Sequence, residues 1–92
     1  MAMVHVSGIE AGQVILYALS TCIWCKKTKQ LLDDLHIAYD YEYVDLLQGS
    51  ERDLAVETVR KWNNACSFPT LVIHDKCIVG YDEKEIREAL KQ

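Results

Sequence analysis

Two cysteines three positions apart are the residues of this chain best suited to carry chemistry. Cys22 and Cys25 follow the apolar run 14–17 and open a stretch with helical periodicity. Thiols at this spacing lie on one face of a helical turn, close enough to form a small disulfide ring. The unpaired backbone N–H groups of a helix start favour the thiolate of the first cysteine. The pair is therefore predicted to be a redox centre with Cys22 as its nucleophile.

Basic residues gather directly after this pair. Lys26, Lys27 and Lys29 follow it, whereas many of the carboxylates concentrate at residues 40–45 and near the end of the chain. A local positive field further favours a thiolate at Cys22. A solvated helix face is the alternative explanation for the lysines.

The cysteines need a strand and a helix to position them, and the flanking sequence predicts both. Residues 13–18 are almost all apolar, which is typical of a central strand covered on both faces. Ser20 and Thr21 are suitable capping residues for a helix. The helix itself is indicated by apolar side chains at helical spacing, namely Trp24, Thr28, Leu31, Leu32 and Leu35.

The middle of the chain predicts a second strand and a second helix. Residues 39–46 largely alternate aromatic with acidic side chains, which favours a half-exposed edge strand. A helix is expected to begin at Gly49-Ser50. One face of that helix carries Ala55, Val59, Trp62 and Cys66, so Cys66 is expected in or near the core.

The last third of the chain predicts a hairpin and a short helix. Pro69 precedes the apolar run 70–73, and a polar turn over residues 74–76 leads to a second run at 77–79. Asp82, with Glu85 three residues later, resembles a capping box at the start of an amphipathic helix.

These elements together predict an α/β fold with the order β-α-β-α-β-β-α. A helix between two strands requires a right-handed crossover and parallel strands, while the short hairpin connection makes the last two strands antiparallel. The expected architecture is a four-stranded mixed sheet flanked by helices, and residues 3–6 allow an extra short N-terminal strand. One domain over residues 13–92 is expected, preceded by an N-terminal extension, residues 1–12.

Size and composition restrict the class of protein. The chain has 92 residues, half of them apolar, and a formal net charge of -4, which argues against binding to nucleic acid or to an anionic membrane. It has no apolar stretch of about 18 residues, and residues 1–12 lack a signal-peptide pattern. We therefore expect a soluble, cytoplasmic protein. In that reducing compartment a C-x-x-C beside a strand–helix–strand pattern indicates a thioredoxin-like redox motif.

Three motifs carry a resemblance to a known family. They are the segment from Tyr17 to Cys25, the segment Ser67-Phe68-Pro69-Thr70 and the segment Val79-Gly80-Tyr81-Asp82. Over residues 13–91 the chain resembles the glutaredoxin branch of the thioredoxin fold. It is also similar to glutaredoxin-like redoxins that serve ribonucleotide reductase and are reduced by thioredoxin reductase. The resemblance implies a thiol-disulfide oxidoreductase acting on protein or low-molecular-weight disulfides.

The same resemblance implies roles for individual residues. Cys22 would be the exposed attacking thiol and Cys25 the recessed resolving thiol of a dithiol mechanism. Pro69 would be a cis-proline opposite the cysteines, although composition alone favours a trans bond. The residues expected to bind substrate are Thr21, Ile23, Trp24, Phe68, Pro69, Gly80, Tyr81 and Asp82.

The chain departs from classical glutaredoxins at positions that matter for glutathione. Leu19 stands where they have a lysine, and Val79-Gly80 stands where they have two glycines. No bound cofactor is expected, and the external reductant is either glutathione or an enzyme of the thioredoxin-reductase type. The expected partners are this donor and the disulfide substrates, and the protein is expected to be a monomer.

Other functions compete with this hypothesis. An iron–sulfur cluster bound through Cys22 and shared between two subunits is the main alternative. A zinc site built from all four cysteines is disfavoured, because Cys66 and Cys77 are far apart in sequence. A non-catalytic adaptor is disfavoured by the intact cysteine pair. The three histidines do not cluster at metal-ligand spacing, so no metal site is predicted.

Overall fold

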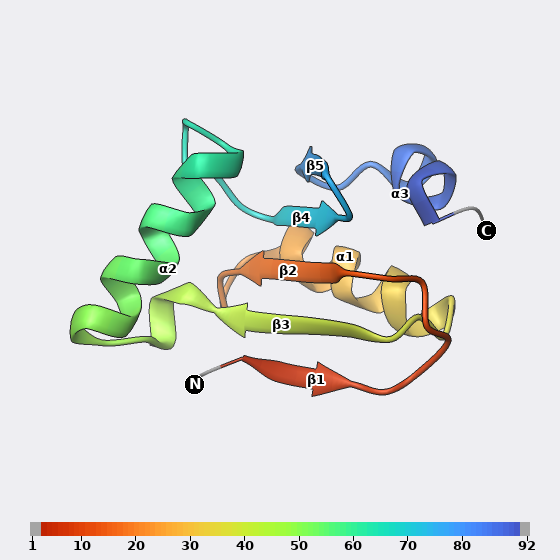
Figure 1. The fold of residues 1–92 in the computed structure, drawn as a ribbon, viewed down its shortest axis with the longest axis horizontal. Coiled ribbons are helices and arrows are strands. Elements are labelled where there is room, and N and C mark those ends of the chain that lie inside the picture. Colours follow the sequence, from red (N-terminus) through yellow and green to blue (C-terminus); the bar gives the residue numbers. More distant parts are fainter. Residues whose placement is uncertain (1–2, 91–92) are drawn as a thin grey trace.

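A five-stranded mixed sheet forms the centre of the molecule, with the strand order β1-β3-β2-β4-β5 (Figure 1). The computed structural model describes residues 3–90. Residues 1–2 of the expected N-terminal extension and residues 91–92 of the expected domain lie outside the described residues. The strands are β1 (Val4–Val6), β2 (Val14–Ala18), β3 (Tyr39–Tyr43), β4 (Thr70–Ile73) and β5 (Lys76–Val79). The helices are α1 (Ile23–Asp34), the 3-10 turn η1 (Val44–Leu46), α2 (Gly49–Trp62) and α3 (Glu83–Leu90). The predicted order of elements and the additional N-terminal strand are confirmed.

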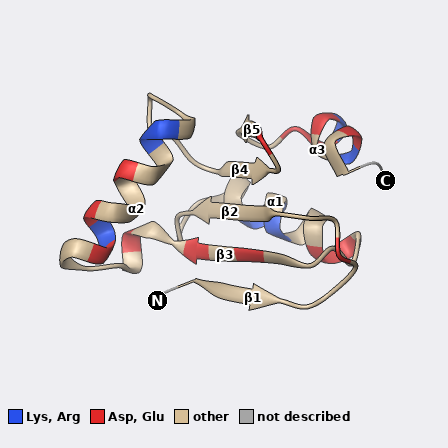
Figure 2. Cartoon of the chain, in the orientation of Figure 1, with Lys and Arg blue, Asp and Glu red and all other residues tan. Residues whose placement is uncertain are grey.

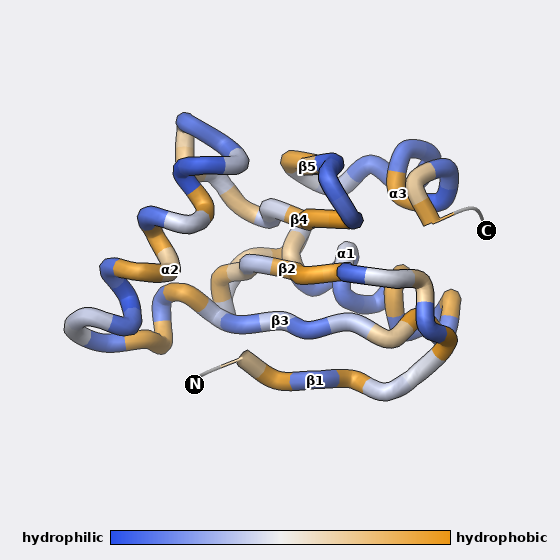
Figure 3. Tube along the Cα trace, in the orientation of Figure 1, coloured by the Kyte–Doolittle hydropathy of each residue, from blue (hydrophilic) through white to orange (hydrophobic). Residues whose placement is uncertain are grey.

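Strand β2 lies at the centre of the sheet and leads to the cysteine pair. It pairs in parallel with β3 and antiparallel with β4. Its apolar residues are covered on both faces, and the hydropathy of β2 and β4 stands out in Figure 3. The prediction of a central strand is confirmed, and the carboxyl end of this strand is therefore held firmly at one edge of the sheet.

The prediction that the aromatic–acidic segment forms an edge strand is wrong. β3 lies between β2 and β1, because Val4–Val6 pairs antiparallel with it and covers its outer edge. Its alternation separates two faces. Tyr39, Tyr41 and Tyr43 pack against the α1 side, and the acidic residues Asp40 and Glu42 alternate with them along the strand (Figure 2). The segment after Tyr43 leaves the sheet as η1 instead of continuing the strand.

Two clusters of buried side chains hold the helices to opposite faces of the sheet. The larger cluster joins the strands to α1 and α3, with Leu32 and Ile86 among its fully buried members. The smaller cluster joins Tyr17 and Val72 of the strands to Val59 of α2. In the view of Figure 1 α1 lies behind the sheet. None of the helices described within residues 3–90 has the length and apolar character needed to cross a membrane.

The C-terminal elements follow the sequence closely, with one exception. The hairpin is formed by β4 and β5, and its two-residue turn contains His74 with a φ of 54°. Asp82 caps α3 by accepting a hydrogen bond from the backbone N–H of Glu85 at 3.1 Å. The exception is Cys66, for which helical spacing predicts a place on the face of the second helix. That helix ends at Trp62, and Cys66 lies in the following loop, packed against the smaller cluster.

The phenol of Tyr39 provides a test of the α1–β3 packing. Its hydroxyl donates a 2.6 Å hydrogen bond to Asp33, and burial together with this bond raises the pKa of Tyr39. We expect Tyr39→Phe to lower the free energy of unfolding by about 1–2 kcal/mol at pH 7. Because the unfolded chain releases the phenolic proton first, this stabilisation is lost as the pH rises above about 10. Urea unfolding of the wild type and of Tyr39→Phe at pH 7 and above about pH 10 checks this. A difference in unfolding free energy between the two proteins that did not change with pH would contradict it.

Candidate active site

Cys22 occupies the N-cap of α1, where its sulfur faces the open end of the helix. Its backbone is extended, with a φ of -88° and a ψ of 119°, and its Sγ accepts a hydrogen bond from the backbone N–H of Cys25 at 3.2 Å. The expectation that Ser20 or Thr21 caps the helix is wrong. Those residues lie in the turn between β2 and α1, which is closed by the Cys22 N–H donating to the carbonyl of Leu19. The cysteine itself therefore makes the capping interaction, which favours negative charge on its sulfur.

Cys25 lies one turn further along α1 and faces the core. Only 1% of this residue is exposed, whereas Cys22 is half-buried. Burial raises the pKa of the Cys25 thiol to about 12, and a hydrogen bond with the Cys22 sulfur adds to the effect. The backbone N–H of Leu19 approaches the Cys25 sulfur at 3.5 Å and acts in the opposite direction. At neutral pH Cys25 is consequently a protonated donor beneath Cys22.

The lysines after the pair do not contribute equally to its surroundings. Lys26 and Lys27 are exposed, and the Lys27 ammonium lies 5.0 Å from the ring centroid of Trp24. Lys29 instead pairs with Asp33 at 3.2 Å and lies over the ring of Tyr41. The positive charge near the cysteines therefore comes from Lys26 and Lys27, and the third lysine belongs to the α1–β3 packing.

The three sequence motifs meet around the cysteine pair. Trp24 is 53% exposed and stacks on Tyr81, with ring centroids 6.2 Å apart and an interplanar angle of 24°. The backbone N–H of Gly80 donates to the carbonyl of Pro69 at 2.9 Å. Gly80 has a φ of +82°, a left-handed conformation that favours glycine. These contacts bring the segments around residues 24, 69 and 80 to one end of the sheet.

Phe68 and Pro69 join this arrangement from the loop before β4. The Phe68–Pro69 peptide bond is cis, Pro69 is buried, and Phe68 is half-buried against both core clusters. The side chain of Asn63 organises the loop, because its amide donates to the Ser67 carbonyl at 3.2 Å and to the Ser67 hydroxyl at 3.0 Å. The Thr70 hydroxyl also donates to that carbonyl, at 2.7 Å. The loop is therefore held by its own polar side chains.

The remaining predicted site residues differ in their surroundings. Thr21 and Ile23 are exposed beside Cys22, and Ile23 leaves 62% of its surface open. Tyr81 stacks on Trp24, so the first turn of α1 and the segment before α3 are neighbours. Asp82 is exposed, and its carboxylate is engaged as the cap of α3. Ile23 and Trp24 thus present an apolar surface beside the half-buried sulfur.

Asp45, which is not among the predicted site residues, holds the turn before Cys22. Its carboxylate accepts hydrogen bonds from the backbone N–H of Ser20 at 2.8 Å and from the Ser20 hydroxyl at 2.5 Å. These bonds lower the pKa of Asp45, and its negative charge contributes to the raised pKa of Cys25. The sequence does hold a signal for it, because parallel strands end at the same edge of a sheet. Residues just after β3 must therefore lie beside those just after β2.

Removing the charge of Asp45 tests its influence on the pair. We expect Asp45→Asn to slow disulfide reduction about tenfold, because the turn that positions Cys22 loses its two charge-assisted hydrogen bonds. It should also lower the pKa of Cys25, so that alkylation of this thiol begins at a lower pH than in the wild type. A pH series of alkylation followed by peptide mass analysis measures the second effect.

The matched control for Asp45→Asn is Asp53→Asn, which removes one carboxylate from an exposed position of α2. This control is expected to leave both the rate and the alkylation profile unchanged. Equal behaviour of the two variants would show that Asp45 does not act on the pair.

The other two cysteines lie outside α1. Cys66 lies in the loop after α2, and Cys77 is half-buried on β5, where burial raises the pKa of its thiol. Among residues 3–90, no three or more His, Cys, Asp or Glu side chains come together in a way that could hold a metal ion.

Comparison with known proteins agrees with this geometry. The glutaredoxin family model matches residues 14–78. A crystal structure of a glutaredoxin from Methanosarcina mazei Go1 has a TM-score of 0.92 and 56% sequence identity, covering 100% of this chain and 90% of the other. Methanosarcina acetivorans methanoredoxin has a TM-score of 0.90 and 49% identity, covering 92% and 90%. Glutaredoxin-1 of Sus scrofa is 29% identical over 80 residues, 86% of this chain and 76% of its own length. The chain, with its C-x-x-C pair at Cys22 and Cys25, belongs to the glutaredoxin family.

Proposed function

We propose that the protein is a thiol-disulfide oxidoreductase that reduces protein or low-molecular-weight disulfides by a dithiol mechanism. The observation that carries the proposal is the asymmetry of the pair. Cys22 is half-buried with its sulfur at the N-terminus of α1, and Cys25 is buried with a pKa raised to about 12. One thiol can therefore meet a substrate as an anion, while the other waits in its protonated form.

In the first step the Cys22 thiolate attacks one sulfur of the substrate disulfide. A new S–S bond forms between Cys22 and that sulfur, the substrate S–S bond breaks, and the other substrate sulfur leaves as a thiolate that takes up a proton. The backbone N–H of Cys25 stabilises the attacking anion through its 3.2 Å hydrogen bond.

In the second step Cys25 releases the substrate. The negative charge of Cys22 helps hold the proton on Cys25, and formation of the mixed disulfide removes that charge. The pKa of Cys25 therefore falls at the stage at which its thiolate must attack. The Cys25 thiolate attacks the Cys22 sulfur, the second substrate thiolate leaves, and a Cys22–Cys25 disulfide remains. The substrate has gained two electrons, and an external thiol or reductase returns two electrons and two protons to the pair.

The residues around the pair supply the binding surface in this proposal. Ile23 and the Trp24–Tyr81 stack offer apolar contacts beside the reacting sulfur. The backbone of Phe68, next to the cis Pro69, is the candidate for strand-like pairing with a bound peptide or thiol. Thr21, Gly80 and Asp82 complete the rim of the same surface.

The donor is the open part of the proposal, and one comparison decides it. Leu19 lies on the turn before Cys22, so this position offers no cation to a glutathione carboxylate. Glutathione with its reductase, and NADPH with thioredoxin reductase, should each be tested with an insulin-type disulfide and with a low-molecular-weight disulfide. We expect protein-dependent NADPH oxidation with at least one donor system, and Cys77→Ser should retain it. Failure with both donors and both substrates would contradict the proposed activity.

A further inference from the structure

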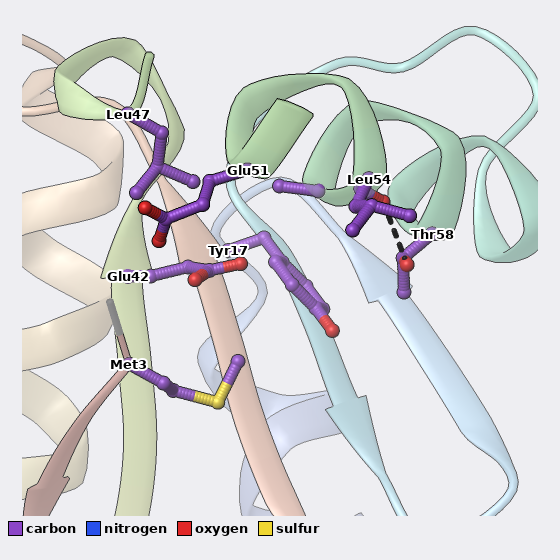
Figure 4. Close-up of a pocket in the computed structure, with 8 residues that line it drawn as sticks. Met3, Tyr17, Glu42, Leu47, Glu51, Leu54 and Thr58 are labelled. Carbon is purple, nitrogen blue, oxygen red and sulfur yellow. Dashed lines mark hydrogen bonds between the residues drawn. The ribbon is translucent and has the colours of Figure 1, made fainter. Parts of the chain in front are cut away.

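A pocket of about 220 Å³ opens on the α2 side of the sheet (Figure 4). Tyr17 of β2 and Glu42 of β3 form its floor, while Leu47, just after η1, and Glu51 and Leu54 of α2 line its wall. The cysteine pair packs against the core cluster on the opposite face, with α1 and α3. The pocket is therefore separate from the site proposed for disulfide exchange, and a ligand bound in it would not require that function.

Two polar side chains on the floor of the pocket are largely buried, and their polar atoms are reached from the pocket. Glu42 is 9% exposed and Tyr17 is 5% exposed. They are register partners on adjacent parallel strands, so both side chains point to the α2 face. Within residues 3–90 neither side chain forms a hydrogen bond or an ion pair, and in Figure 4 both lie open to the pocket. The carboxylate oxygens of Glu42 are not sealed from solvent but are reached through the pocket, so a ligand that enters the pocket can pair with this largely buried acidic side chain.

The charges around the pocket define the ligand as a cation. Burial raises the pKa of Glu42, and the nearby carboxylate of Glu51 raises it further. Burial also raises the pKa of Tyr17, and the charge of Glu42 adds to that effect. No lysine or arginine is among the described residues that line the pocket. A bound cation would relieve both the burial cost and the repulsion between the two carboxylates.

The apolar walls distinguish an organic cation from a metal ion. A hard divalent cation needs about six or more oxygen ligands, whereas leucine and alanine side chains contribute much of this lining. Leu54 is 64% exposed at the mouth, which leaves an apolar contact available to a carbon chain. The volume suits a short chain and is below the roughly 300 Å³ or more of drug-sized ligand sites. An ammonium group has three donors, which can serve the oxygens of the Glu42 carboxylate.

We propose that this pocket binds a primary alkylammonium group, with the charge on Glu42 and the carbon chain against Leu47 and Leu54. Two sources share this chemistry: a free small amine and a lysine side chain of a protein that docks on the α2 face. Lysine fits because its stem contacts apolar surface while its terminal charge reaches a polar group.

A nuclear magnetic resonance titration of the whole protein tests the proposal. Butylammonium chloride is the probe. 1-Butanol is the uncharged control with the same carbon chain, and Nα-acetyl-lysine amide represents a lysine within a protein. We expect saturable shifts at Tyr17, Glu42 and Leu54 with butylammonium, and binding at least about tenfold weaker with Glu42→Gln. Glu57→Gln removes a carboxylate from an exposed position of α2 that does not line this pocket, and it should bind like the wild type. 1-Butanol should bind at least about tenfold more weakly than butylammonium.

The outcomes distinguish a free amine from a lysine side chain as the ligand, and they show whether the pocket binds an alkylammonium group at all. Tighter binding of the lysine amide than of butylammonium would indicate a lysine side chain as the ligand, and the reverse order would indicate a free amine. Because Glu42 lies in the sheet, Leu54→Ala serves as a second variant at an exposed position and should weaken butylammonium binding about threefold. Shifts that do not saturate, equal binding of butanol, or unchanged affinity in Glu42→Gln would overturn the proposal.

Discussion

Replacing Cys22 by serine is expected to lower the rate of disulfide reduction by at least about 10³-fold. A serine hydroxyl is not an anion near neutral pH and does not exchange with disulfides, so the first step has no nucleophile. The hydroxyl can still accept the hydrogen bond that the Cys25 N–H now donates to sulfur, so the start of α1 should survive the change. The measurement is steady-state turnover of a protein disulfide with the donor that supports the wild type.

The control for Cys22→Ser is Cys77→Ser, which makes the same chemical change on β5. We expect this control to turn over at the wild-type rate and the Cys22 variant to keep its folded circular dichroism spectrum. A Cys22→Ser protein that reduced the substrate as fast as the wild type would show that another residue is the nucleophile.

Replacing Cys25 by serine should stop the cycle after its first step. The mixed disulfide between Cys22 and the substrate forms, but no thiol lies beneath it to attack, so the adduct accumulates. We expect turnover of a protein disulfide to fall about 10²-fold, with some residual activity where an external thiol resolves the adduct. Intact-mass analysis of a reaction quenched with acid measures the adduct directly.

Reduction of the trapped adduct distinguishes this mechanism from simple damage to the core. Cys25 is almost fully buried, and serine retains its size closely, so the variant should remain folded. Excess dithiothreitol should release the substrate from Cys22 and return the protein to its expected mass. A folded Cys25→Ser protein that forms no adduct, or that turns over at the wild-type rate, would contradict the resolving role.

Much of the fold could be predicted because local patterns and tertiary packing agree in it. The apolar run of β2, the helical spacing in α1 and the Asp82 cap of α3 each indicate their element without knowledge of the rest. The position of β3 could not be inferred from its own residues. Its alternation is compatible with an edge, and only pairing with the short Val4–Val6 strand places it inside the sheet. Neighbours distant in sequence decide such cases.

The candidate site could be predicted from the sequence to a similar extent as the fold. The cysteine pair and the convergence of its three motifs follow from residue types and from the family pattern. The capping role of Cys22 depends on how tightly the turn after β2 closes, which the capping preferences of Ser20 and Thr21 do not reveal. The burial of Glu42 was also hidden, because acidic residues are mostly exposed and its cover comes from α2.

The central claim is that Cys22 is the accessible, attacking thiol above a buried, protonated Cys25. Treating the reduced protein with a limited amount of iodoacetamide at pH 7, followed by peptide mass analysis, tests it most directly. We expect modification at Cys22 with almost none at Cys25, whose pKa is raised to about 12, and we expect Cys25 to react only as the pH is raised. Modification of Cys25 as fast as Cys22 at pH 7, or an unreactive Cys22, would contradict the account.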